Sequence, residues 1–167
     1  MIIGIGGCSR SGKTQLAQQL AEAVGKGVQS ALVIHQDDFV LDPAFIPKIK
    51  KHINWEIPES IDFARFRHAI RRAHRAHDIV IVEGLLVYHD PQITALFDEL
   101  IFLEIEEATF DARKKRDDRW PEPKWYREHI WASFLQYGQA PRMGDFIFLS
   151  GEEPIDLPTL IEQLSLA

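Results

Sequence analysis

A glycine-rich segment near the start of the chain has the composition and spacing of a phosphate-binding loop. Residues 7–14 have the sequence GCSRSGKT and match G-x-x-x-x-G-K-[ST] at every fixed position. Glycines let such a loop curl so that successive backbone N–H groups point at phosphate oxygens. Lys13 can reach the outer phosphates of a nucleotide, and the Thr14 hydroxyl can ligate Mg²⁺. The segment therefore predicts a site for a nucleoside triphosphate with magnesium.

The flanks of this loop also suit phosphate binding. It follows an apolar run at residues 2–5, typical of a buried strand, and precedes a helical pattern with Leu16, Leu20 and Val24 on one face. The positive end of that helix dipole would face the phosphates. We expect the loop and the helix start to hold the nucleotide through Gly7, Ser9, Ser11, Gly12, Lys13, Thr14 and Gln15.

Acidic residues follow two other strand-like runs. Asp37 comes just after residues 31–35, and Glu83 just after residues 79–82. The carboxyl ends of parallel strands form the ligand-binding edge of an open sheet, so both acids would lie beside the phosphate loop. Asp37 could deprotonate an attacking hydroxyl and contact metal, and Glu83 could contact metal or act as an auxiliary base. The alternatives are a turn or helix cap, for which Asp38 is the better candidate, and a solvated strand end for Glu83.

Two further segments carry residues suited to substrate binding. In residues 51–62, Trp55 could stack on a base while Glu56 accepts hydrogen bonds from ribose hydroxyls, although Trp55 could equally fill the core beneath the loop. Residues 113–124 combine arginines, lysines and prolines. They could form a lid that stabilises a transferring phosphoryl group and excludes water, or simply a basic helix end.

Strand-like runs alternate with helical patterns, which predicts an α/β fold with a parallel sheet. The expected strands are residues 2–5, 31–35, 79–82, 100–104 and 146–149, and the expected helices are 13–24, 61–74, 91–97, 107–117, 124–137 and 158–164. The 167 residues would form a single domain, residues 1–167, with a substrate loop at about 38–60 and a lid at about 113–125.

Composition restricts the partners and the location. A formal net charge of −6 argues against broad nucleic-acid binding, and no apolar run approaches the roughly 20 residues of a membrane helix. The only cysteine, Cys8, excludes an internal disulfide, and because the apolar run of the first strand begins at residue 2 we expect no secretory signal. The seven histidines lack metal-ligand spacing, so no zinc site is expected. We expect a cytoplasmic monomer or small homo-oligomer whose partners are small molecules.

Several motifs occur in order along the chain. They are the phosphate loop, QDDF at 36–39, NWEIPESID at 54–62, EG at 83–84, RDDR at 116–119, HIW at 129–131 and FLSG at 148–151. Together they resemble the nicotinamide riboside kinase family of uridine-kinase-like P-loop kinases. The resemblance implies a P-loop NTPase fold with a five-stranded parallel sheet. It also implies ATP- and Mg²⁺-dependent phosphorylation of the 5′-hydroxyl of nicotinamide riboside, a step of NAD salvage.

The resemblance further implies residue roles. Asp37 would be the catalytic base and a Mg²⁺ contact, assisted by Lys13 and Glu83, and Thr14 would ligate Mg²⁺. Trp55 would stack on the nicotinamide ring. The remaining expected contacts are Glu56 and Arg116 on the ribose, Asp38 and Phe39 beside the acceptor, Arg119 on phosphate, Trp120 on the second ring face, and Ser150 and Gly151 beside adenine.

The chain departs from the family in two places, and other acceptors stay open. Glu56 stands where Asp is more usual, and Arg10 is an unusually bulky loop residue that either contacts phosphate or points to water. Uridine and cytidine kinases share the same frame, so uridine, cytidine or another small metabolite such as pantothenate is the alternative acceptor.

Other classes of nucleotide-binding protein give weaker matches. A regulatory switch of the GTPase kind would carry an N-K-x-D motif, and none occurs. A dinucleotide-binding dehydrogenase is excluded because Ser9 stands where G-x-G-x-x-G requires its third glycine.

Overall fold

A parallel β-sheet forms the centre of the molecule. The computed structural model describes residues 1–25, 29–117 and 121–166. Its five-stranded sheet has the order β2-β5-β1-β6-β7, with all neighbouring strands parallel. The strands are β1 (Ile2–Gly7), β2 (Ala31–His35), β5 (Ile79–Glu83), β6 (Glu99–Glu104) and β7 (Phe146–Ser150). The predicted α/β fold and its five strands are confirmed.

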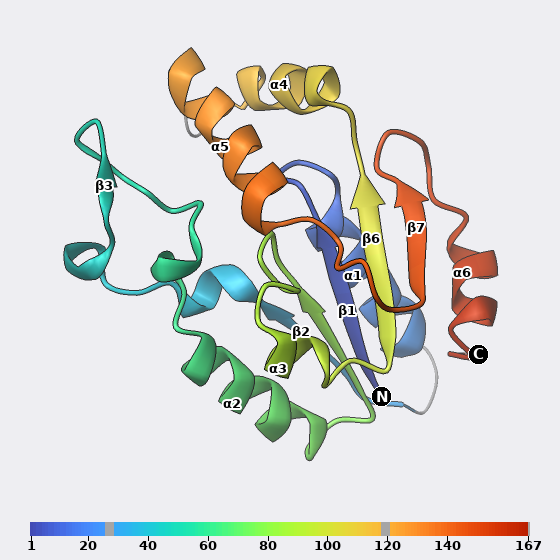
Figure 1. Cartoon of the computed structure of the whole chain (residues 1–167). Coiled ribbons are helices and arrows are strands. Elements are labelled where there is room, and N and C mark those ends of the chain that lie inside the picture. The colour runs from blue at the N-terminus through green and yellow to red at the C-terminus, as the bar shows by residue number, and fades with distance from the viewer. Residues whose placement is uncertain (26–28, 118–120, 167) are drawn as a thin grey trace.

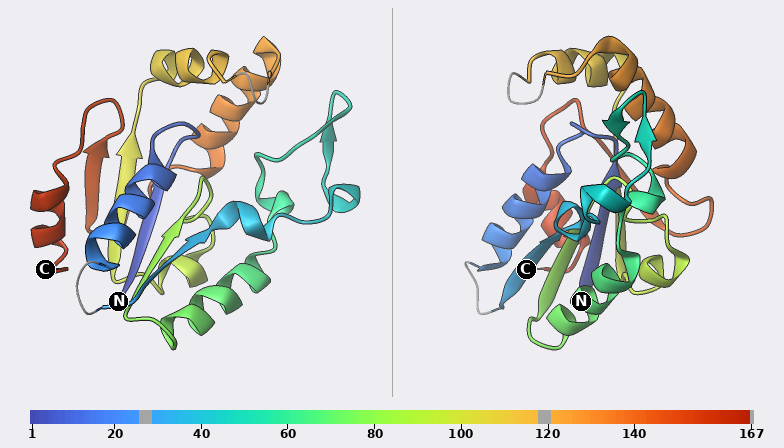
Figure 2. Two further views of the ribbon diagram at one scale, coloured as in Figure 1. Left: turned by 180° about the vertical axis from the view of Figure 1, so that it is seen from behind. Right: turned by 90° about the vertical axis from the view of Figure 1, so that its left-hand side faces the viewer.

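Helices cover both faces of this sheet (Figures 1 and 2). Helices α1 and α6 lie on one face, α2, α3 and α5 lie on the other, and α4 lies beyond the carboxyl end of β6. The helices are α1 (Lys13–Gly25), α2 (Phe63–His74), α3 (Pro91–Thr94), α4 (Glu107–Lys115), α5 (Lys124–Tyr137) and α6 (Leu157–Gln163). No helix among the described residues has the length and apolar character needed to cross a bilayer.

Alternate residues of β1 pack into two separate hydrophobic clusters. Ile3 and Ile5 belong to the cluster that contains Leu16 of α1, whereas Ile2 belongs to the cluster that contains Phe66 of α2. Successive side chains of a strand point to opposite faces, so a central strand covered on both sides must be apolar throughout. All six residues of β1 are buried. This packing fixes the position of the loop that follows β1.

The predicted irregular region at residues 38–60 contains a small hairpin. Its strands are β3 (Lys48–Ile49) and β4 (His52–Ile53), which pair antiparallel. Lys50 and Lys51 form the turn with φ of 44° and 69°. Tight hairpin turns with positive φ usually carry Asn, Asp or Gly, so two lysines gave no turn signal in the sequence.

Candidate active site

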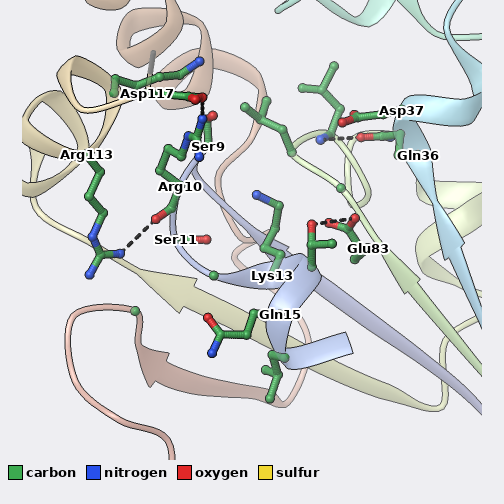
Figure 3. Close-up of a pocket in the computed structure, with 18 of the residues that line it drawn as sticks. Ser9, Arg10, Ser11, Lys13, Gln15, Gln36, Asp37, Glu83, Arg113 and Asp117 are labelled. Atoms are coloured by element: carbon green, nitrogen blue, oxygen red, sulfur yellow. Dashed lines mark hydrogen bonds and ion pairs between the residues drawn. The ribbon is translucent and has the colours of Figure 1, made fainter. Parts of the chain in front are cut away.

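A cavity of about 1420 Å³ opens at the carboxyl ends of the strands. Its wall combines the phosphate loop, the ends of β2 and β5, the segment around Trp55, the end of α4 and the loop after β7. Figure 3 shows side chains of the phosphate loop, of the segments that end β2 and β5, and of α4 and the residues just after it around this space. Predicted site residues in the wall are Ser9, Ser11, Gly12, Lys13, Thr14, Gln15, Asp37, Trp55, Glu56, Glu83, Arg116, Ser150 and Gly151.

The Lys13 side chain folds back over the phosphate loop and contacts the loop backbone. Gly12 has a φ of 100°, a conformation that residues with a Cβ rarely adopt. Lys13 is buried, and its Nζ donates a hydrogen bond to the Cys8 carbonyl at 2.8 Å. Burial lowers the pKa of Lys13, while the neighbouring Glu83 carboxylate opposes that shift. A bound polyphosphate would supply the negative charge that a buried ammonium requires.

Glu83 joins β5 to the phosphate loop and to β2. Its Oε1 accepts a hydrogen bond from the Thr14 hydroxyl at 3.0 Å and lies 2.7 Å from His35 Nδ1. The parallel pairing of β2 with β5 places His35 directly opposite Glu83, which explains this contact. With Glu83 ionised, His35 Nδ1 carries the proton and donates it. The three side chains therefore form one polar cluster at the strand ends.

Asp37 lies in the cavity wall beside this cluster. It belongs to a 3₁₀ turn, Gln36–Phe39, that follows β2 directly. Desolvation raises the pKa of Asp37 and Glu83 raises it further, whereas Lys13 acts in the opposite direction. A carboxylate with a raised pKa is a better proton acceptor than an ordinary aspartate.

Asp38 and Phe39 are not among the residues that line the cavity. The backbone carbonyl of Asp38 accepts a hydrogen bond from the Arg65 guanidinium. The Phe39 ring packs against Phe66 with 5.0 Å between ring centroids. Both residues thus join the 3₁₀ turn to α2 in this structure.

Trp55 and Glu56, the predicted acceptor contacts, both line the cavity. Trp55 is 40% exposed and lines the cavity, so the interpretation of it as a core residue is wrong. Desolvation raises the pKa of Glu56 to about 7, with Lys114 opposing the shift and Glu122 and Asp37 adding to it. Glu56 can therefore exchange its proton near neutral pH.

The end of α4 carries basic groups to the phosphate loop. Arg113 donates a hydrogen bond to the Arg10 carbonyl at 2.8 Å, and the Arg10 side chain forms an ion pair with Asp117. Arg10 also lines the cavity, so its predicted contact with phosphate stays a prediction. Lys114 pairs with Glu122 at 2.9 Å, and Arg116 lines the cavity. Arg119 and Trp120, predicted as a phosphate clamp and a ring contact, lie outside the described residues.

Sequence reasoning missed several residues that organise this site. Gln36 is buried, and its Oε1 accepts a hydrogen bond from the Leu86 backbone N–H at 2.8 Å. The QDDF motif contained Gln36, but nothing in the motif indicated a backbone partner in the turn after β5. The His35 contact depends on strand register, and the Asp117 contact depends on how α4 packs.

The oxygen-rich corner of the cavity fits a magnesium ion bound together with phosphates. Mg²⁺ is usually held by one or two carboxylates plus substrate phosphates and waters. Thr14, Asp37 and Glu83 offer the hydroxyl and carboxylate oxygens for such an ion. Within the described parts of the chain, no group of three His, Cys, Asp or Glu side chains is gathered closely enough to hold a metal alone.

Known proteins similar to this chain are kinases. No family model matches it. It is 26% identical to the nicotinamide riboside kinase of Eremothecium gossypii over an alignment that covers 75% of this chain and 70% of that protein. It is also 26% identical to the uridine kinase of Leuconostoc citreum over 143 residues, which cover 70% and 68%. The structure of a possible uridine kinase from Bacillus stearothermophilus matches with a TM-score of 0.59 and 20% identity, over 89% of this chain and 88% of that one.

These similarities agree with the resemblance found in the motifs. The chain is similar to nicotinamide riboside kinases and uridine kinases over most of its length, and its fold is that of the P-loop kinases. The comparisons support an ATP-dependent kinase.

Proposed function

We propose that the protein transfers the γ-phosphoryl group of ATP to the 5′-hydroxyl of nicotinamide riboside. The observation that carries the proposal is a single cavity whose wall includes the phosphate loop, Asp37, and the Trp55–Glu56 pair. One part of this wall suits a polyphosphate, and another suits a flat ring attached to a ribose. The acceptor is the cationic pyridine riboside, and the reaction would take place in the cytoplasm with small-molecule partners.

Asp37 is the proposed base of this reaction. The acceptor oxygen attacks the γ-phosphorus, the bond between that phosphorus and the bridging oxygen of ADP breaks, and the hydroxyl proton passes to Asp37. The raised pKa of Asp37 supports this role. Lys13 would hold the outer phosphates, and Thr14 and Glu83 would hold Mg²⁺. Magnesium, when bound, neutralises phosphate charge during the transfer.

Trp55 and Glu56 are the proposed acceptor contacts. The half-exposed Trp55 indole offers a flat apolar face to a pyridine ring. Glu56 would accept hydrogen bonds from the ribose hydroxyls, with Arg116 nearby in the same wall. Its side chain is one methylene longer than the aspartate more usual in the family, so the ribose would lie correspondingly farther from the backbone.

Uridine is the second candidate acceptor. A uridine kinase matches the chain at the same 26% identity as a nicotinamide riboside kinase. Uridine also presents a flat ring and a ribose with a 5′-hydroxyl, so Trp55 and Glu56 in the cavity wall could bind it in the same way. Trp120 is expected on the second face of the ring, so the choice between uridine and nicotinamide riboside depends in part on this residue.

Substitution of Trp55 tests the acceptor site. Stacking on an aromatic side chain is worth about 1–3 kcal/mol per base, so Trp55→Ala should raise the riboside KM at least about fivefold. The KM for ATP should stay within about twofold, because Trp55 is not part of the phosphate loop, and Trp55→Phe should retain part of the affinity. Steady-state ADP release at varied riboside and varied ATP measures both constants. An unchanged riboside KM in Trp55→Ala would remove Trp55 from the acceptor site.

A further inference from the structure

Helix α5 holds the proposed acceptor segment through residues on one face. Tyr126, His129 and Ser133 are spaced by three and four positions, so they lie along the same side of the helix. Tyr126 is buried, and its hydroxyl donates a hydrogen bond to the Ile53 carbonyl at 3.2 Å. His129 Nε2 lies 2.7 Å from Asn54 Oδ1. Two consecutive residues just before Trp55 are therefore tied to α5.

The His129 contact is the stronger of these ties. Asn54 is only 9% exposed, so its side-chain oxygen needs a protein partner. Because a carbonyl oxygen only accepts, His129 Nε2 carries the proton in this contact. Burial lowers the pKa of His129, which favours the neutral ring. The Ser133 hydroxyl oxygen lies 3.4 Å from the same ring nitrogen and, with the proton on Nε2, can act there only as a second, weaker acceptor.

The other end of the acceptor segment is also fixed, but by a local contact. The Ser60 hydroxyl is fully buried and lies 2.8 Å from the Trp55 carbonyl and 2.7 Å from the Ile57 carbonyl. Trp55 and Glu56 therefore lie between a local anchor at Ser60 and a long-range anchor at α5. The second anchor connects them to another layer of the molecule.

Helix α5 is in turn joined to α4, whose end reaches the phosphate loop. Arg127 of α5 donates a hydrogen bond to Asp111 of α4 at 2.7 Å, and Trp131 of α5 packs against Phe110 of α4 at 5.4 Å between ring centroids. The chain of contacts thus runs from Asn54 through α5 and α4 toward Arg113 at the phosphate loop.

We propose that His129 is a positioning residue that sets the geometry of the acceptor site by holding Asn54, and with it Trp55 and Glu56, against α5. This inference rests on the proposed function in one respect, that Trp55 and Glu56 bind the acceptor. His129 itself is not among the residues that line the cavity. Because His129 contacts Asn54 directly but reaches the phosphate loop through α5 and α4, we expect its main effect on the placement of the acceptor.

Replacement of His129 separates this role from a general effect on folding. Loss of one positioning hydrogen bond is expected to raise the KM for nicotinamide riboside about tenfold in His129→Ala, with the KM for ATP within about twofold. In His129→Gln the side-chain amide nitrogen reaches the place of Nε2 and can still donate to Asn54, so the KM should return to within about threefold of wild type. In His129→Asn the amide is too short to do so, and the KM should resemble that of His129→Ala.

Hydrogen–deuterium exchange in the protein without ligands gives a second readout. Amides of residues 52–57 should exchange faster in His129→Ala and His129→Asn than in wild type, and at the wild-type rate in His129→Gln. Tyr126→Phe, which removes the other tie, should also accelerate exchange there. Equal rises in the two KM values, a Gln variant that behaves like the Ala variant, or unchanged exchange at residues 52–57 would each overturn the proposal. If wild-type protein phosphorylates neither nicotinamide riboside nor uridine, the proposed function fails, and the exchange experiment still decides the role of His129.

Discussion

Asp37 and Asp38 are neighbours in the sequence but occupy different surroundings. Asp37 lines the cavity, where desolvation and Glu83 raise its pKa. Asp38 is absent from the cavity wall, and its carbonyl is bound by Arg65 of α2. A short 3₁₀ turn directs adjacent side chains in different directions, so Asp37 lines the cavity and Asp38 does not.

This separation makes the two residues a matched pair for mutagenesis. Asp37→Asn removes the proposed base while keeping the size of the side chain, and kcat should fall by about 10²–10⁴. The ATP dissociation constant should change far less, because the base acts in the transition state. Asp38→Asn should keep kcat within about threefold of wild type. Steady-state kinetics with ATP titration measures these constants, and equal losses of kcat in the two variants would contradict the assignment of Asp37.

Glu56 predicts a pH dependence of acceptor binding. Desolvation raises its pKa to about 7, so the carboxylate is lost as the pH falls through that value. A protonated carboxyl loses much of its capacity to accept hydrogen bonds from two hydroxyls. The riboside KM should therefore rise about tenfold between about pH 8 and about pH 6, as expected for one titrating group.

Glu56→Gln is the control for this pH effect. Glutamine keeps one acceptor oxygen and does not titrate, so its riboside KM should be higher than wild type at about pH 8 and nearly constant down to about pH 6. A pH profile of KM for both proteins makes the comparison. The assignment would be wrong if the variant showed the same rise as wild type.

At the scale of elements, the loop after β7 packs directly on the phosphate loop. The Gly151 N–H donates to the Glu104 carbonyl at 2.8 Å. A Cβ at Gly151 would lie 2.5 Å from the Ser11 carbonyl oxygen and 2.7 Å from Ile105 Cγ2, both closer than real contacts allow. One of these neighbours is backbone and cannot rotate away, so the two loops must separate if a side chain is added.

Gly151→Ala should therefore weaken nucleotide binding. Overpacking costs about 1–3 kcal/mol, so we expect the KM for ATP to rise at least about fivefold and the melting temperature to fall. Gly25→Ala is the control, because a Cβ at Gly25 would meet no atom within 4 Å. It should leave the KM for ATP unchanged. An ATP KM in Gly151→Ala equal to that of the control would show that the β7 loop does not fix the phosphate loop.

The same scale shows which elements the sequence could predict. The five strands were predicted because parallel strands are short, nearly continuous apolar runs. The start of α2 shifted only from residue 61 to Phe63, because Asp62 caps the helix. The hairpin of β3 and β4 was not predicted. Its strands have only two residues each, and its lysine turn lacks the usual turn residues.

At the scale of the whole molecule, the sequence predicted which residues line the cavity. It did not predict the long-range contacts that hold the segments of the cavity wall in place. Lys13, Thr14, Asp37 and Glu83 could be grouped because each lies at or after the carboxyl end of a parallel strand. The bond between His129 and Asn54 could not be predicted, because it depends on the packing of α5 against a segment 75 residues away. Periodicity shows which face of a helix is apolar but not which distant loop that helix contacts.

The central proposal about the whole molecule is that the protein phosphorylates a pyridine riboside. The most direct test is a mass-spectrometric product screen in which purified protein, Mg²⁺ and ATP are incubated separately with nicotinamide riboside, nicotinic acid riboside, uridine, cytidine, adenosine and pantothenate. Lys13→Ala, which removes the phosphate-loop ammonium, serves as the inactive control. We predict a phosphorylated product predominantly from the pyridine ribosides and none from the Lys13→Ala protein. A dominant product from uridine or pantothenate would contradict the proposed acceptor, and no product from any compound would contradict the proposed kinase activity.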